Sequence, residues 1–153
     1  MSVVRLGEHS AAVGESPLWD AQRRAIHWVD ITGRRIFRTQ MDGSTDVLEV
    51  FEPVGSIART PGPELIAALK SGVFRLSFNA PQITLIGAPP GHASSHRFND
   101  ATTDARGNLI VGTVSLTAPG EPSGRLYQLR PDGEWRLLLE GFRTLNGLAV
   151  SAN

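Results

Sequence analysis

The sequence repeats one order of short strands and turns three times, and this repeat constrains the fold more than any other feature. A glycine-containing turn followed by an apolar or aromatic run recurs around Phe37, Phe74 and Tyr127. Phe37 and Phe74 are 37 positions apart, and the polar insert 117–123 lengthens the next interval. A period of about 40–45 residues with several strands in each unit is typical of β-propeller blades.

Each round contains runs of β-branched and aromatic residues bounded by turn residues, which is the pattern of short strands. Asp-Gly turns at 42–43 and 132–133 separate neighbouring runs, as in β-hairpins. No segment has a helical periodicity, so the local pattern is β from end to end. The predicted strands are 25–31, 33–38, 46–51, 64–69, 71–76, 82–86, 108–113, 124–129 and 134–139.

The repeat predicts an all-β fold, a β-propeller of which the chain holds about three blades and the start of a fourth. The three rounds fill residues from about 12 to 141, and a fourth begins at 146–151. A β-sandwich with evenly spaced strands is the alternative, but a sandwich does not require the turns to recur in register. Propellers need about four to eight blades to close. Residues 1–153 are therefore expected to form a single, incomplete domain, either a fragment or a chain that self-associates through its open blade edges.

The composition excludes several classes of function. Lys+Arg and Asp+Glu number 15 each, so no net charge attracts nucleic acid or an anionic membrane. There is no cysteine, which excludes disulfides and thiolate metal sites. The first residues lack the apolar core of a signal peptide, and no apolar run is long enough to cross a bilayer. We therefore expect a cytoplasmic protein with no nucleic-acid or membrane partner.

Polar residues recur at one place in the repeat, where each round enters its innermost strand. Glu15 lies there in the first round, Asn99 in the third and Asn146 in the fourth. Because these places converge on the axis at one face of a propeller, we expect the three side chains to face a common point. Their oxygen atoms suit Ca²⁺, Mg²⁺ or Mn²⁺, and Zn²⁺ is not excluded. Taken singly, each asparagine is better explained as a turn residue, since Asn-Gly and Asn-Asp are common turn dipeptides.

Five motifs follow one another along nearly the whole chain. They are GESPLWD at 14–20, WVDI at 28–31, RFND at 97–100, GT at 112–113 and NGLA at 146–149. Together they resemble the N-terminal half of the senescence-marker-protein/gluconolactonase/regucalcin family. The resemblance implies a six-bladed β-propeller that hydrolyses sugar lactones and related esters with one divalent metal ion.

The same resemblance implies roles for individual residues. By it, Glu15 and Asn146 match metal ligands, and Arg97 matches a substrate-binding arginine. Asn99 matches a residue beside the metal that contacts the substrate or coordinates the ion. The implied cofactor is one divalent metal ion, with Ca²⁺ as the first choice and Zn²⁺, Mg²⁺ or Mn²⁺ as alternatives. The implied partner is a small-molecule sugar lactone.

The sequence also departs from the family pattern. Ala101 stands where the family usually has glycine, and the run after Gly112-Thr113 lacks the acidic residues often found there, which leaves the lactone open. The family's remaining metal ligand is an aspartate that is also the candidate general base. That aspartate belongs to the C-terminal half, so we assign no catalytic residue in this chain.

Two functions are carried forward from these observations. The first is metal-dependent hydrolysis of a sugar lactone, as in gluconolactonases, impaired or absent in a chain without the base. A chain of this kind would be a hydrolase acting on lactones or carboxylic esters. The alternative is a non-catalytic propeller fragment that binds calcium or another ligand.

Overall fold

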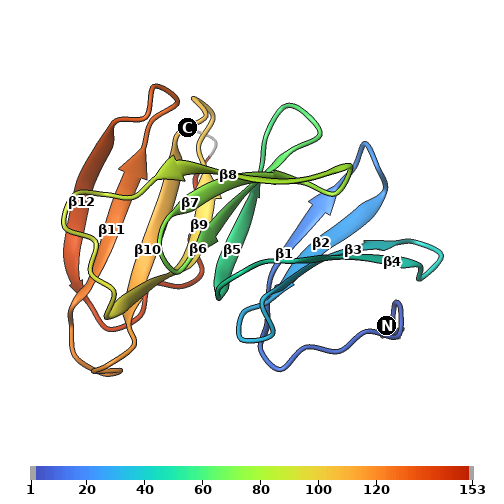
Figure 1. Ribbon diagram of the computed structural model, residues 1–153, viewed down its shortest axis with the longest axis horizontal. Coiled ribbons are helices and arrows are strands. Elements are labelled where there is room, and N and C mark those ends of the chain that lie inside the picture. The colour runs from blue at the N-terminus through green and yellow to red at the C-terminus, as the bar shows by residue number, and fades with distance from the viewer. Residues whose placement is uncertain (1–2, 152–153) are drawn as a thin grey trace.

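The computed structural model describes residues 3–151, except for the side chain of Pro81, and confirms the all-β prediction. Within the described residues, twelve strands form three four-stranded antiparallel sheets. Figure 1 shows the first sheet at the right, the second in the middle and the third at the left. Residues 3–151 contain no helix that could span a membrane.

Each sheet is a meander of four consecutive strands, as expected for one propeller blade. The first sheet contains β1 (Gly14–Asp20), β2 (Ala25–Asp30), β3 (Arg35–Gln40) and β4 (Thr45–Glu49). The second contains β5 (Val54–Arg59), β6 (Leu65–Leu69), β7 (Val73–Ser77) and β8 (Ala80–Gly87). The third contains β9 (His96–Thr103), β10 (Leu109–Ser115), β11 (Gly124–Leu129) and β12 (Trp135–Phe142). The three predicted rounds are therefore three blades.

The first strand of each sheet is the innermost one. β5 packs against β1 and β2 on one side and against β9 on the other, so β1, β5 and β9 lie together in the middle of the molecule. The sequence patterns predict that Glu15 and Asn99 lie between strands, where the chain enters the innermost strand, and this part of the prediction is wrong. Glu15 and Asn99 lie within β1 and β9 themselves.

A β-bulge or register shift in each inner strand accounts for the error. In β1 the bulged residues are Ser16 and Pro17, and Ser16 has a positive φ of 52°. In β9 they are Asn99 and Asp100, and in β5 the register shifts at Gly55. A bulge breaks the two-residue alternation that marks a strand and redirects the side chains beside it. The bulges therefore hide the inner strands in the sequence and also orient residues at the candidate site.

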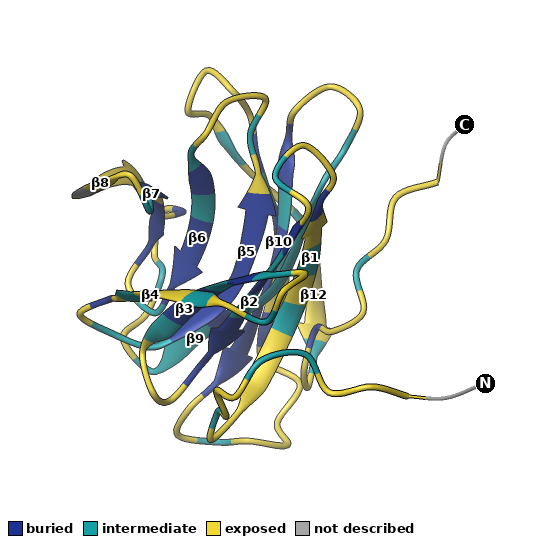
Figure 2. Cartoon of the chain, turned by 90° about the vertical axis from the view of Figure 1, so that its right-hand side faces the viewer, coloured by how far each residue is buried: buried dark blue, intermediate teal, exposed yellow. Residues whose placement is uncertain are grey.

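Two apolar clusters fill the spaces between neighbouring sheets. The cluster between the first and second sheets contains Val29, Ile31, Ile36, Val50, Val54, Ile57, Leu65, Ala67, Leu69, Phe74 and Leu76. The cluster between the second and third contains Ala58, Ala68, Val73, Phe98, Leu109, Val111, Tyr127 and Leu129. Figure 2 shows this burial along β5 and β6, whereas β12 is mostly exposed. Burying one large apolar side chain contributes about 1.5–3 kcal/mol, so these two interfaces hold the blades together.

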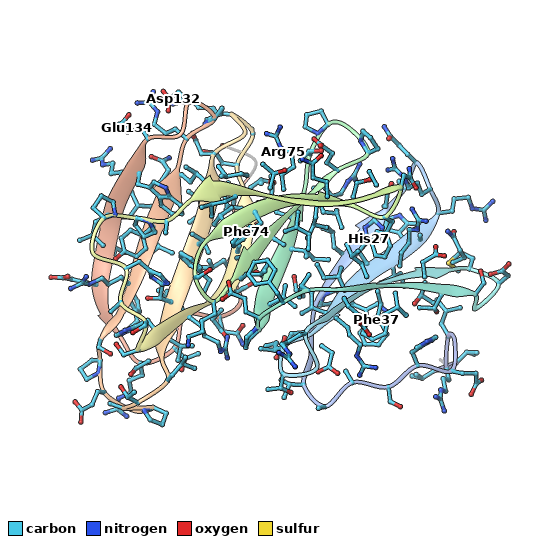
Figure 3. The ribbon with its side chains drawn as sticks, in the orientation of Figure 1. His27, Phe37, Phe74, Arg75, Asp132 and Glu134 are labelled. Carbon is cyan, nitrogen blue, oxygen red and sulfur yellow. The ribbon has the colours of Figure 1, made fainter. Side chains whose placement is uncertain are left out.

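The N-terminal segment covers part of the outward face of the first sheet. Phe37 is fully buried there, stacks on Trp28 at a ring-centroid distance of 4.0 Å and contacts the ring of His9 at 5.5 Å. His27 faces the second sheet instead, where its ring stacks on Phe78. Figure 3 shows His27 and Phe37 on opposite sides of the first sheet. This arrangement follows from the two-residue period of side chains along a strand.

Candidate functional site

The candidate site lies at the end of the molecule where β1 and β9 begin. There Nη1 of Arg97 donates to the backbone oxygen of Phe98 at 2.9 Å and to Oδ1 of Asn99 at 2.7 Å. Nδ2 of Asn99 donates in turn to the backbone oxygen of Leu145 at 2.8 Å. Only this orientation of the carboxamide serves both partners, because a guanidinium only donates and a backbone carbonyl only accepts. Asn99 thus joins β9 to the segment that follows β12.

Asp100 holds the same segment from the next position in β9. Its Oδ2 accepts the backbone N–H of Leu148 at 2.7 Å. Leu145 is buried against Gly112, where a Cβ on the glycine would overlap the Leu145 side chain. Asn146 lies between these two anchors, and its exposed side chain has no hydrogen bond to any other residue in the described range 3–151. Asn146 is therefore presented to solvent beside the Asn99 carboxamide.

Glu15 interacts with this cluster through its charge. It is the second residue of β1, is exposed, and its carboxylate accepts no hydrogen bond from the part of the chain that the structure describes. Burial lowers the pKa of Arg97, and the Glu15 carboxylate opposes that shift, so the two charges lie within electrostatic range. The structure thus brings Glu15, Arg97 and Asn99 to one end of the inner strands. Their roles as ligands and substrate contacts stay predictions.

β5 sets the spacing between β1 and β9 through Gly55 and Ile57, which belong to none of the motifs. Oγ of Ser16 accepts the backbone N–H of Ile57 at 3.0 Å, which ties the β1 bulge to β5. Gly55 lies against the backbone oxygens of Phe98 and Asn99, where a Cβ would overlap both. A glycine inside a strand often marks such a close backbone approach. The glycine at position 55 predicts this close approach only if residues 54–59 are first identified as a strand.

The oxygen atoms at this site fit a hard divalent cation with few charged ligands. Glu15 and Asn146 have uncommitted side-chain oxygens, whereas Oδ1 of Asn99 already accepts from the cationic Arg97. Among the described residues there is no group of three or more His, Cys, Asp or Glu that could hold a metal ion. The donor set is thus one carboxylate and carboxamides. Ca²⁺ accepts such ligands together with water, and it binds weakly when few of them are charged.

Comparison with known proteins leads to the same assignment as the motifs. The family model described as "SMP-30/Gluconolactonase/LRE-like region" matches residues 13–153. The chain belongs to this family.

Three relatives illustrate the membership. The chain is 30% identical over 149 residues to the putative sugar lactone lactonase YvrE of Bacillus subtilis (strain 168), a match covering 97% of this chain and 51% of that protein. It is 31% identical over 144 residues to the 6-deoxy-6-sulfogluconolactonase of Pseudomonas putida, a match that covers 92% of this chain and 48% of that protein. It is 30% identical over 140 residues to regucalcin of Gallus gallus, a match that covers 86% of this chain and 47% of that protein.

Solved structures related to this SMP-30/gluconolactonase/LRE-like chain support its fold. A calcium-binding protein, regucalcin, from Agrobacterium tumefaciens superposes with a TM-score of 0.79 at 19% identity, over 87% of this chain and 45% of that one. A gluconolactonase from Xanthomonas campestris superposes with a TM-score of 0.71 at 20% identity, over 85% of this chain and 48% of that one. The three sheets are therefore blades of a β-propeller of the six-bladed type. The chain spans about half the length of the relatives it matches.

Proposed function

We propose that this chain forms the metal- and substrate-binding part of a propeller enzyme that hydrolyses a sugar lactone. In this proposal Glu15 and Asn146 supply uncommitted oxygen ligands to one divalent metal ion, with Ca²⁺ as the first choice. Asn99 supplies the second lone pair of its Oδ1, the first being taken by Arg97. Arg97 and Asn99 contact the substrate. The observation that carries the proposal is the hydrogen-bonded chain from Arg97 through Asn99 to Leu145, beside the charge of Glu15. The lactonases among the relatives support it.

Arg97 is the residue best suited to hold a polar substrate. Its Nη1 is committed to Phe98 and Asn99, whereas Nε and Nη2 have no hydrogen-bond partner among residues 3–151. Guanidinium donors suit the hydroxyl oxygens of a lactone and the carboxylate of the acid that hydrolysis releases. Partial burial strengthens such hydrogen bonds because less water competes for them. A metal ion bound beside this group supplies a Lewis acid for the lactone carbonyl.

Hydrolysis also needs a group that takes a proton from the attacking water. Glu15 serves poorly as that base when its oxygens hold a metal ion. Oδ2 of Asp100 is engaged with the backbone N–H of Leu148. We therefore infer that the base lies outside residues 1–153 and that the isolated chain has weak or no lactonase activity.

Calcium titration tests the ligand assignment. Isothermal titration calorimetry is expected to give one Ca²⁺ site with a Kd of about 0.1–1 mM, the range of weak calcium modules with few charged ligands. Glu15→Gln removes the uncommitted carboxylate and is expected to weaken binding about tenfold or more. Glu49→Gln, at an exposed position on β4, is the matched control and should leave the affinity unchanged. Equal affinities for the two variants would contradict the assignment.

Acid release from gluconolactone, measured with Ca²⁺, Mn²⁺ or Zn²⁺ in turn, tests the inference about the base. The isolated chain is expected to give a rate close to the uncatalysed one with each ion. Turnover near the enzyme median of about 10 s⁻¹ would overturn the inference, because it requires a competent base within this chain.

The second candidate function is a non-catalytic propeller that binds calcium or a small ligand. Two observations favour it: among the described residues of the site only Glu15 offers an uncommitted carboxylate, and a calcium-binding regucalcin shares the fold. A version of the protein with a full set of blades discriminates the candidates. Ca²⁺ binding without turnover of any sugar lactone favours the binding protein, whereas metal-dependent acid release favours the lactonase.

A further inference from the structure

His27 is a buried titratable residue that the proposed function does not use. It lies in β2 between its cross-strand partners, Leu18 of β1 and Arg38 of β3, and is 3% exposed. Neither of its ring nitrogens has a hydrogen-bond partner among the described residues. Most buried polar side-chain atoms have such a partner, so His27 is an exception at an interface between two blades.

Phe78 covers the His27 ring from the second sheet. The two rings stack with a centroid distance of 5.7 Å and an interplanar angle of 15°. Phe78 and Asn79 form the turn between β7 and β8, which the pairing of Ser77 with Ala80 closes. Figure 1 shows this turn reaching from the second sheet toward the first. Phe78 is half-buried and Asn79 is exposed, and exposed turns open at a lower free-energy cost than buried strands.

His27 itself is held in place by the first sheet. β2 pairs with β1 along one edge and with β3 along the other, so its backbone has hydrogen-bonded neighbours on both sides. A change in the charge of His27 therefore acts on the element that covers the ring, which is the β7–β8 turn.

Three arginines disfavour a protonated His27. Arg38 contacts the same Phe78 ring, with its guanidinium carbon 4.7 Å from the ring centre. The charges of Arg23, in the β1–β2 turn, and of Arg59, at the end of β5, act on His27 in the same direction. Burial is the main cause that lowers the pKa of His27 from its ordinary 6.5, and these cations add to it.

Asp20, at the end of β1, is the acid that favours a protonated His27, but its carboxylate is already occupied. Its Oδ2 accepts from Nη1 of Arg23 at 2.7 Å, and its Oδ1 accepts two backbone N–H groups of the β1–β2 turn. Asp46 of β4 is paired with Arg38 at 2.9 Å, and the β7–β8 turn contains no acidic residue. A protonated ring covered by the turn would therefore carry a buried charge without an acceptor for its N–H groups.

We propose that the His27–Phe78 contact is a pH-sensitive closure between the first and second blades. When the His27 ring is neutral, the β7–β8 turn lies against the first sheet. Protonation places a second cation beside Arg38 at the same aromatic ring, and the charged imidazole is hydrated only when the turn moves away. None of these residues belongs to the candidate site, so the closure does not depend on the proposed lactonase function.

A pH titration of the isotope-labelled chain, followed by NMR, tests the proposal. The His27 ring is expected to titrate with a midpoint below pH 6.5, and the amides of Phe78 and Asn79 are expected to shift with the same midpoint. The nuclear Overhauser effect between the His27 and Phe78 rings should be lost in the acid form. An effect that persists when His27 is protonated would overturn the proposal, and so would loss of the β5 and β6 signals together with it, because that is unfolding of the whole blade.

A variant of the turn tests whether Phe78 sets the titration of His27. Phe78→Ala is expected to move the His27 midpoint up toward pH 6.5, because the ring is then hydrated in both charge states. Phe51→Ala is the matched control, since Phe51 is 58% exposed and packs edge-on against Phe74. It should leave the midpoint unchanged, and equal midpoints in the two variants would refute the closure.

A variant of the histidine tests whether its proton causes the release. His27→Phe keeps a ring on which Phe78 can stack but cannot take up a proton, so it is expected to abolish the response of amides 78–79 below pH 6.5. His92→Phe is the matched control, because His92 stacks on Phe98 at 4.6 Å in another part of the fold. It should leave the response in place. A response of amides 78–79 that survives in His27→Phe would assign the release to another group and overturn the proposal.

Discussion

Asp30 is fully buried. Its carboxylate accepts hydrogen bonds from the segment before β1, from the turn between β2 and β3 and from the first residue of β3. Arg35 and the backbone N–H of Gly33 donate at 2.8 and 3.0 Å, and the backbone N–H groups of Ala12 and Val13 each donate at 3.2 Å. Burial alone would raise the pKa of Asp30, but these donors outweigh it and hold the pKa at about 2. The position at which β1 begins therefore depends on an ionised Asp30.

The stability of the protein is expected to fall between about pH 4 and pH 2 because of this residue. The unfolded chain protonates Asp30 near its ordinary pKa of 3.8, whereas the folded chain does so only near 2. The stabilisation is thus fully present above that window and is lost as the pH falls through it, by about 2 kcal/mol. Urea denaturation over a pH series measures it.

Asp30→Asn is the control for that measurement. It should flatten the pH dependence in this window and lower the stability at pH 7, since it removes the buried anionic partner of Arg35 and of the backbone donors around it. An unchanged slope between about pH 4 and pH 2 in the variant would assign the acid loss to other groups. His27 affects the stability at higher pH. Burial lowers its pKa from the ordinary 6.5, so the stability that its neutral ring contributes is lost as the pH falls below about 6.5.

At the scale of the element, the bulged inner strands determine what the site can be. β1, β5 and β9 approach one another closely enough for Ser16 to bond β5 and for Gly55 to lie against the backbone of β9. A bulge in β9 places Asn99 and Asp100 together opposite Gly112, so both can reach the segment after β12. The site is thus a product of strand packing more than of any one loop.

Gly55→Ala is expected to destabilise the protein by about 2 kcal/mol or more, because the added Cβ overlaps backbone that cannot move aside cheaply. Gly62→Ala is the matched control, since its nearest neighbour is Oγ1 of Thr60 at 3.8 Å. Urea denaturation measures the stability, and the amide shifts of Arg97 and Asn99 report the site. Equal stability of the two variants would mean that β5 and β9 do not meet as closely as described.

At the scale of the whole molecule, three blades leave the outward faces of the first and third sheets without a neighbouring blade. Trp19 is 47% exposed on the first sheet, and Leu139 is 56% exposed on the third. In propellers and other repeat folds such faces are covered by the next repeat. The relatives are about twice as long as the chain, which is the length that further blades require.

We expect the chain to self-associate through these faces. Size-exclusion chromatography with light scattering should give a mass above the 16.5 kDa of one chain, rising with concentration. Trp19→Gln/Leu139→Gln should lower that mass, because it removes apolar surface from both faces. Leu116→Gln, at a position 44% exposed in the connection after β10, is the control. A monomer at every concentration, or association unchanged in the double variant, would contradict the expectation.

The nine predicted strands correspond to the three outer strands of every sheet, and the three unpredicted ones are the inner strands. The outer strands have the alternation or apolar runs that mark strands in a sequence. β5 is buried on both faces, so its side chains do not alternate between apolar and polar. β1 and β9 contain bulges rich in Ser, Pro, Asn and Asp, which are also turn residues.

The sequence by itself determined the repeat, the all-β blades and the family, because these depend on periodicities and motifs within short stretches of chain. Only the tertiary structure decided that the Asn99 carboxamide is committed to Arg97 and to a carbonyl 46 positions away. The same is true of Gly55, which lies against the backbone of β9. The contacts of Asn99 with Leu145 and of Gly55 with β9 join segments far apart in the sequence, and their distances are set by the packing of apolar sheet faces, which no local pattern records.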